Sequence, residues 1–257
     1  MSPIRFLGIS LLCSALASTA FADVTLKSKA SATGMVGAMA GDTVQYVKGL
    51  KMRTDQTTGQ GRRTTTIIDV AARQMIVLDN DAKEAQVIDM TSLSESLNKV
   101  GASEITTSIT PTGRTRTVAG QSCTVHDLKI AVPMQMGQAK MTMVMSGPQC
   151  LVKNGPGQSD IQAFYRAASE KGGFLDATQA RTRPAAAKAM TDMYRQMAEL
   201  GVPFVSEMKM SIDAAGPMAE MMKKMETTIT TEVVEVSTGS IPSTMFDVPA
   251  GYKISKK

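Results

Sequence analysis

Methionine side chains recur at regular spacings, and their thioether sulfurs could bind either a soft metal ion or an apolar ligand. The chain has 21 methionines but only six phenylalanines. Four groups stand out: Met134 and Met136; Met141, Met143 and Met145; Met208 and Met210; and Met218, Met221, Met222 and Met225. Thioether sulfur is a soft ligand that selects Cu(I). The same flexible side chains also form apolar surfaces that adapt to ligands of different shape.

The spacing of the first three groups favours apolar binding over metal binding. Side chains two residues apart lie on the same face of a strand, so these methionines occupy positions where Leu or Ile would serve a buried face. The fourth group, at residues 218–225, differs because it contains the charged pair Lys223-Lys224. We therefore keep Met218, Met221, Met222 and Met225 as an alternative Cu(I) site, and we expect no cofactor.

Catalytic side chains show no arrangement typical of an enzyme. His126 is the one histidine of the chain, and no Gly-x-Ser-x-Gly motif offers a nucleophile for it to activate. Asp and Glu occur singly, on predicted turns and on the polar faces of predicted strands. We therefore predict that the protein is not an enzyme and that His126 is structural. The net charge of +5 is spread along the chain and Trp is absent, so we expect no nucleic-acid partner.

Residues 1–22 have the pattern of a secretory signal peptide. Arg5 precedes a short apolar run, and Ala20 and Ala22 occupy the small-residue positions before a cleavage site. The apolar run is too short to span a bilayer. The prediction is export to the periplasm with cleavage after Ala22, which also removes Cys13.

The two remaining cysteines, Cys123 and Cys150, are predicted to form a disulfide, since an exported chain with an even count pairs its thiols. A hairpin folded about Met136-Gly137 would place them directly opposite each other. The same register would pair apolar residues on one face of the hairpin: Leu128 with Met145, Ile130 with Met143, and Val132 with Met141.

Most of the chain has the pattern of short strands. Residues 24–31 alternate apolar and polar side chains, and residues 43–90 predict a meander of five strands joined by short polar turns. A turn at Pro111-Thr112-Gly113 is expected before the central hairpin. Further strands are predicted at 203–213 and 226–237.

Two helices are predicted late in the chain, at 161–171 and 184–200. The first carries apolar residues at helical spacing, and the second begins at Pro184 and carries a methionine-rich stripe. Strands and helices do not alternate, which argues against a parallel α/β fold. The predicted fold is α+β, with a large curved antiparallel sheet, or incomplete β-barrel, whose concave face is covered by the helices, in a single domain over residues 23–257.

Several segments together resemble a known group of proteins. They are YVKGLKMRTDQ at 46–56, TTTIIDVAARQMIVLD at 64–79, the cysteine pair, the late helix ending in LGVPF, and the terminal FDVPAGYK. With the leader, they look like an uncharacterised family of exported, methionine-rich proteins that carry a domain of unknown function. That family is similar in layout to the outer-membrane lipoprotein carriers (LolA-like). The resemblance covers most of the mature chain and implies an incomplete β-barrel with a helical lid over a hydrophobic cavity.

These observations predict a periplasmic, non-catalytic carrier for a lipid, an acyl chain or another hydrophobic small molecule. The residues expected to line its cavity are Leu128, Ile130, Val132, Met141, Met143, Met145, Met208, Met210 and Ile212. The carrier is expected to be a monomer with peripheral contact to the envelope membrane. Two alternatives stay open: a Cu(I)-binding protein of metal stress, and a structural envelope protein with no ligand.

Overall fold

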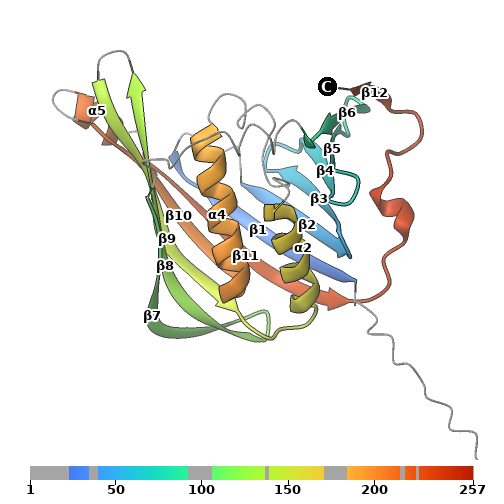
Figure 1. Ribbon diagram of the computed structural model, residues 1–257, viewed down its shortest axis with the longest axis horizontal. Coiled ribbons are helices and arrows are strands. Elements are labelled where there is room, and N and C mark those ends of the chain that lie inside the picture. Colours follow the sequence, from blue (N-terminus) through green and yellow to red (C-terminus); the bar gives the residue numbers. More distant parts are fainter. Residues whose placement is uncertain are drawn as a thin grey trace, which may run out of the picture.

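The residues that the structure describes form one 12-stranded sheet, with the two longer helices against one of its faces (Figure 1). The computed structural model describes residues 23–34, 40–91, 106–136, 139–170, 184–214, 218–223 and 226–256. The predicted signal peptide lies outside these residues. Among the described helices, none is long and apolar enough to cross a membrane.

The strand order is β12-β6-β5-β4-β3-β2-β1-β11-β10-β9-β8-β7, so neighbouring strands are consecutive in sequence except at two places. The first exception is β1, which pairs antiparallel with β11 as well as with β2. The second is β12, which pairs parallel with β6 at one edge. The sheet is therefore two meanders that meet at β1 and β11, and it is not closed into a barrel.

We call the first meander, together with β12, the N-terminal half-sheet. Its strands are β1 (Val24–Ala32), β2 (Gly41–Lys48), β3 (Lys51–Thr58), β4 (Arg63–Asp69), β5 (Gln74–Asp79), β6 (Glu84–Asp89) and β12 (Lys253–Lys256). The predicted meander over 43–90 is confirmed. Its alternating apolar residues pair across neighbouring strands, as Met52, Ile68 and Met75 do in β3, β4 and β5.

We call the second meander the C-terminal half-sheet. Its strands are β7 (Thr106–Val118), β8 (Gln121–Met136), β9 (Ala139–Val152), β10 (Val202–Asp213) and β11 (Thr227–Thr238). The predicted turn at Pro111-Thr112-Gly113 is wrong, because β7 continues through these residues. Its pairing with β8 shifts between Pro111 and Thr115, so the extra residues form a bulge that bends the strand.

Helices α2 (Gln158–Glu170) and α4 (Pro184–Leu200) lie side by side on the same face of the sheet (Figure 1). Both predicted helices are thus present. The Gln162 side chain donates a hydrogen bond to the Ala198 carbonyl oxygen (2.7 Å), and Arg166 pairs with Glu199 (3.1 Å). Two shorter helices, α5 (Met218–Lys223) and η2 (Ser243–Phe246), follow β10 and β11.

The N-terminal half-sheet is covered on both faces. On the helix side, Ile161 and Phe164 of α2 are buried in one cluster with residues such as Val24, Val47 and Ile68. On the other face, a second cluster joins strand residues to the segment after β11. Its buried members are Ile67, Ile76, Leu78, Ala85, Ile241 and Phe246.

Polar contacts fix that C-terminal segment, residues 239–252, to the N-terminal half-sheet. Arg53 donates to the Met245 carbonyl oxygen (2.7 Å). Tyr252 donates its hydroxyl hydrogen to the Asn80 side-chain oxygen (2.8 Å). Asp23 accepts the backbone N–H of Ile241 (2.6 Å), so the start of β1 and the segment after β11 are held together.

Candidate apolar-ligand pocket

The hairpin of β8 and β9 has the predicted faces but not the predicted register. Ile130 pairs with Met145 and Val132 with Met143, so β9 is displaced by two residues from the expected pairing. Consequently Cys123 lies opposite Val152, and Cys150 lies opposite Val125. Because side chains alternate with a period of two, the displacement leaves every side chain on its expected face.

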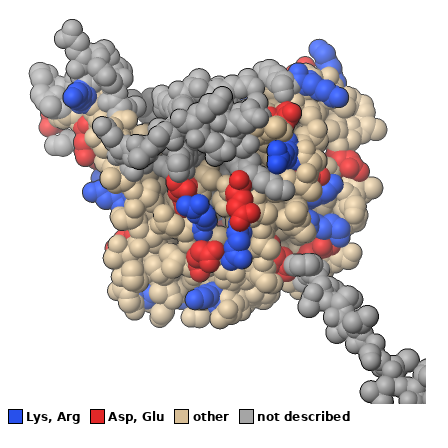
Figure 2. All heavy atoms as spheres, in the orientation of Figure 1, with Lys and Arg blue, Asp and Glu red and all other residues tan. Residues whose placement is uncertain are grey.

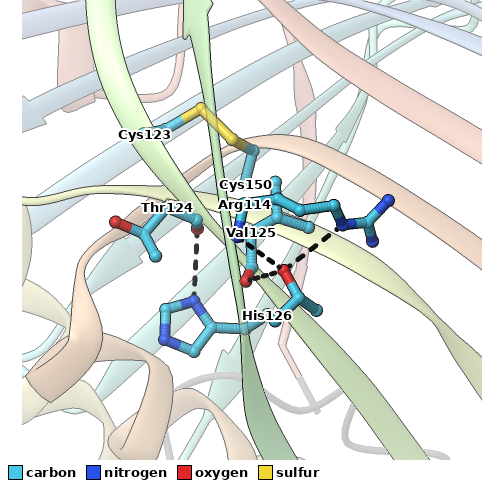
Figure 3. The surroundings of a disulfide bond; sticks show 7 residues. Arg114, Cys123, Thr124, Val125, His126 and Cys150 are labelled. Atoms are coloured by element: carbon cyan, nitrogen blue, oxygen red, sulfur yellow. Dashed lines mark hydrogen bonds between the residues drawn. A yellow bond between two sulfur atoms is a disulfide. The ribbon is translucent and has the colours of Figure 1, made fainter.

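The disulfide between Cys123 and Cys150 is confirmed, and it joins β8 and β9 diagonally. The two Cα atoms are 5.3 Å apart, and both cysteines are buried. Beside them, the Thr112 hydroxyl in the β7 bulge donates to the Val125 carbonyl oxygen (2.8 Å; Figure 3). The cross-link and this hydrogen bond tie β7, β8 and β9 together near one end of the C-terminal half-sheet.

His126 lies on the other side of β8 from the disulfide (Figure 3). It is buried, with Nδ1 placed 3.2 Å from the Thr124 carbonyl oxygen, where it can donate a hydrogen bond. Beyond His126 along β8, Leu128 and Ile130 are buried and pack under α4. The strand therefore contributes to two clusters: the disulfide end to the cluster that contains α2, and the Leu128–Ile130 end to the cluster under α4.

A pocket of about 360 Å³ lies between this part of the sheet and the helices. A volume in this range is typical of sites for small molecules. Its lining residues come from β8, β9, β10, β11, α2 and α4: Leu128, Ile130, Met145, Gln149, Tyr165, Met193, Met197, Pro203, Ser206, Met208, Met210, Ile229 and Thr231.

Five of the nine predicted cavity residues line this pocket: Leu128, Ile130, Met145, Met208 and Met210. The sheet register brings them together, because Ile130 pairs with Met145 and Met145 with Met210. The other four are Val132, Met141, Met143 and Ile212, which are absent from the lining. Val132, Met143 and Ile212 form the next cross-strand row on the same face, and Met141 is buried farther toward the hairpin turn.

The residues that cover the pocket and the polar residue at one end of it were not predicted from the sequence. Met193 and Met197 of α4 are buried against Leu128 and Ile130. Their spacing of four residues was a visible signal of an apolar helix face, but it did not indicate which part of the sheet that face would cover. Gln149 was missed because a polar residue among apolar strand positions gives no indication of a pocket.

The backbone at Gly147 allows β9 and β10 to approach closely beside the pocket. Its φ of 153° is uncommon for residues with a side chain, and a Cβ there would overlap the Glu207 carbonyl group. Gly147 follows Ser146, which pairs with Lys209, so the close approach lies within the β9–β10 ladder. Glycine is required here because any larger residue would push these two strands apart.

The methionines at 218–225 are not shown to form a metal site. Met222 of α5 is buried, with 4% of its surface exposed, so it does not offer its sulfur to solvent. Met225 and the side chains of Met218 and Met221 lie outside the described residues. Among the residues that the structure describes, no cluster of three or more His, Cys, Asp or Glu could hold a metal ion.

A second hollow, of about 440 Å³, has charged side chains in its lining. It lies against the N-terminal half-sheet between the β2–β3 and β4–β5 turns and η2, and the ion pair of Lys51 with Asp69 (3.0 Å) lies on its lining. Acidic and basic side chains are also interspersed over the face shown in Figure 2, which agrees with the spread of charge in the sequence. The pocket under α4 differs in that its described lining contains no charged side chain.

A scan against models of protein families found no match to this chain, and a search of curated proteins found none either.

Proposed function

We propose that this protein is a periplasmic, non-catalytic carrier that holds a lipid, an acyl chain or a similar apolar molecule in the pocket under α4. The observation that carries the proposal is the lining itself. Methionines from β9, β10 and α4 meet around one cavity with Leu128 and Ile130. Burial of each ligand methylene there would contribute about 0.8 kcal/mol without any specific polar contact.

The lining also supports a non-catalytic role. Among the described residues around the cavity there is no Asp, Glu, His, Cys or Lys to activate the hydroxyls of Tyr165, Ser206 and Thr231. His126 is on the same face of β8 but is engaged by the Thr124 carbonyl oxygen. The disulfide is consistent with an oxidising compartment such as the periplasm. A LolA-like half-barrel, with α2 and α4 as the lid, belongs to the same proposal.

The test is native mass spectrometry of the mature protein purified gently from the periplasm, followed by organic extraction. We expect a co-purifying lipid or fatty compound of defined mass. Met210→Asp should abolish it, because the substitution places a carboxylate in an apolar cavity.

The matched control is Lys209→Asp, which puts the same side chain on the neighbouring residue of β10. The Lys209 side chain is 52% exposed, so this variant should keep the ligand. Thermal unfolding of both variants checks that they are folded. A wild-type protein that carries nothing and takes up no lipid from vesicles, or a Met210→Asp variant that keeps its ligand, would contradict the proposal.

A further inference from the structure

One end of the pocket under α4 is polar. Ser206 of β10 pairs with Gln149 of β9 on one side and with Thr231 of β11 on the other, so the three form one cross-strand row. All three line the pocket. The row of Ile130, Met145 and Met210, on β8, β9 and β10, lies farther along the sheet toward the β8–β9 turn. A ligand that fills the pocket therefore meets hydrogen-bonding groups at one end and apolar side chains at the other.

Gln149 is the most deeply buried of these polar groups, with 2% of its surface exposed. Its Nε2 donates to the sulfur of Met208 (3.0 Å). A thioether is a weak acceptor. Within the described part of the chain, the side-chain oxygen of Gln149, Oε1, accepts no hydrogen bond. Buried amides normally have good hydrogen-bond partners. The side-chain amide of Gln149 therefore has an N–H group in a weak hydrogen bond and an oxygen that accepts none among the described residues. Both lie beside the cavity.

The described lining offers no charge to balance an ionic head group at this end. His126 of β8, which pairs with Gln149, is not part of the lining. Among the described lining residues there is no Lys, Arg or His, and no Asp or Glu. An ionised carboxylate or phosphate placed there would lose its hydration without gaining a counter-charge, which is strongly unfavourable. A neutral head group that both donates and accepts hydrogen bonds would lose far less, because the Gln149 amide replaces its water.

We infer that the pocket selects an uncharged amphiphile whose hydroxyl or amide head group binds Gln149, with Ser206 and Thr231 beside it. This inference rests on the carrier function proposed above and specifies the class of ligand. Long-chain alcohols and acylglycerols have this chemistry, whereas fatty acid anions and phospholipids do not.

The experiment measures binding of three probes with the same chain, decanol, decanoate and 1-chlorodecane, to the mature protein by equilibrium dialysis at neutral pH. Wild-type protein should bind decanol at least about tenfold more tightly than decanoate. Gln149→Leu should weaken decanol binding by about five- to tenfold. The same variant should leave the affinity for 1-chlorodecane unchanged or higher, because this probe has no hydrogen to donate. Gln86→Leu, the same substitution in β6 away from the pocket, should change neither affinity.

The outcomes separate the two proposals. If wild-type protein binds decanoate as tightly as decanol, or if Gln149→Leu leaves decanol binding unchanged, the head-group inference fails while the carrier function stands. If the wild-type protein binds none of the three probes, the head-group inference and the carrier function are both contradicted. Should Gln149→Leu not fold, Ser206→Ala combined with Thr231→Val tests the same polar row. This double variant must then lower the affinity for decanol and not that for 1-chlorodecane.

Discussion

The two half-sheets are built from the same type of strand but packed in different ways. The N-terminal half-sheet is buried on both faces, by α2 on one side and by the segment after β11 on the other. In the C-terminal half-sheet, the face under α4 lines a pocket. Outward-facing residues in the middle of its strands, such as Asp127, Lys129 and Lys209, are exposed.

The choice of side chains follows this difference. Ile67, Leu78 and Val47 are branched residues that fill the N-terminal half-sheet almost without exposed surface. Around the pocket, five of the lining residues are methionines, whose unbranched side chains change rotamer at little cost. The comparison therefore separates two parts of one continuous sheet. One is a tightly packed frame, which is the N-terminal half-sheet with α2 against it, and the other is a methionine-lined site that can change shape.

Removing a large side chain from the frame should have the largest effect on stability. Phe164 of α2 is fully buried, so Phe164→Ala should lower the free energy of unfolding by about 3–5 kcal/mol. Met208→Ala should cost clearly less, because the Met208 side chain already borders empty space in the pocket. Urea unfolding measures both. Equal losses would show that the two half-sheets do not differ in packing.

The next effect concerns the cross-link at the end of the C-terminal half-sheet. Cys123 and Cys150 are 27 residues apart in sequence, and the chain-entropy model assigns a loop of this size about 3.5 kcal/mol. The double variant Cys123→Ser/Cys150→Ser should lose that stability, as measured by urea unfolding. Reduction of the wild-type protein should give the same loss. A loss confined to the reduced protein would show that the serine hydroxyls compensate.

A smaller loss is expected where the C-terminal segment meets the frame. Tyr252 donates to Asn80, Asn80 to the Thr65 hydroxyl (3.0 Å), and Thr65 to Asp55 (2.6 Å). Tyr252→Phe breaks this chain at its first hydrogen bond and should cost about 1 kcal/mol. Amide hydrogen exchange should accelerate in β6 and β12. Acceleration in β9 and β10 instead would mean that the two half-sheets do not respond separately.

The smallest effect is a pH dependence confined to the frame. The Ala82 backbone N–H and then Arg62 lower the pKa of Asp79, the Arg63 backbone and side chain lower that of Asp81, and the Thr91 backbone lowers that of Asp89. Each folded-state pKa lies below the unfolded value, so the stabilisation is present above the ordinary Asp pKa of 3.8 and is lost as the pH falls through the lowered values.

Urea unfolding above and below that pH measures the loss. The Asp79→Asn variant should lose less stability on acidification than the wild type. An identical pH dependence in the two proteins would contradict the assignment of this effect to Asp79.

The hairpin of β8 and β9 shows how far the sequence alone could lead. The alternation of Leu128, Ile130 and Val132 predicts which side chains share a face, and this part was correct. The same alternation is satisfied by any displacement of two residues, so it cannot choose between a turn at residues 136–137 and the observed pairing of Met136 with Ala139. The cysteines did not decide it either, since a disulfide can also join diagonal neighbours.

Contacts between distant segments were beyond prediction for a different reason. Met193 and Met197 clearly lie on the apolar face of a helix, but the position of α4 over Leu128 and Ile130 depends on how the whole sheet curves. The bulge in β7 shows a related limit. A proline with a glycine two residues later is typical of a turn, yet both residues are tolerated in an edge strand. One edge of such a strand has no partner strand, so the backbone N–H that proline lacks leaves no acceptor unsatisfied.

The pairing of β1 with β11 has a consequence in time. Val24 of β1 pairs with Thr238 of β11, so the seam between the meanders cannot form until β11 has been made. Strands β2 to β6 can form local hairpins during synthesis. β1 can pair with β2, but its other edge stays unpaired until β11 is present. Such long-range pairing slows folding and prolongs exposure of strand edges. Synthesis of β11 therefore determines when the open edge of β1 is covered and protected from aggregation.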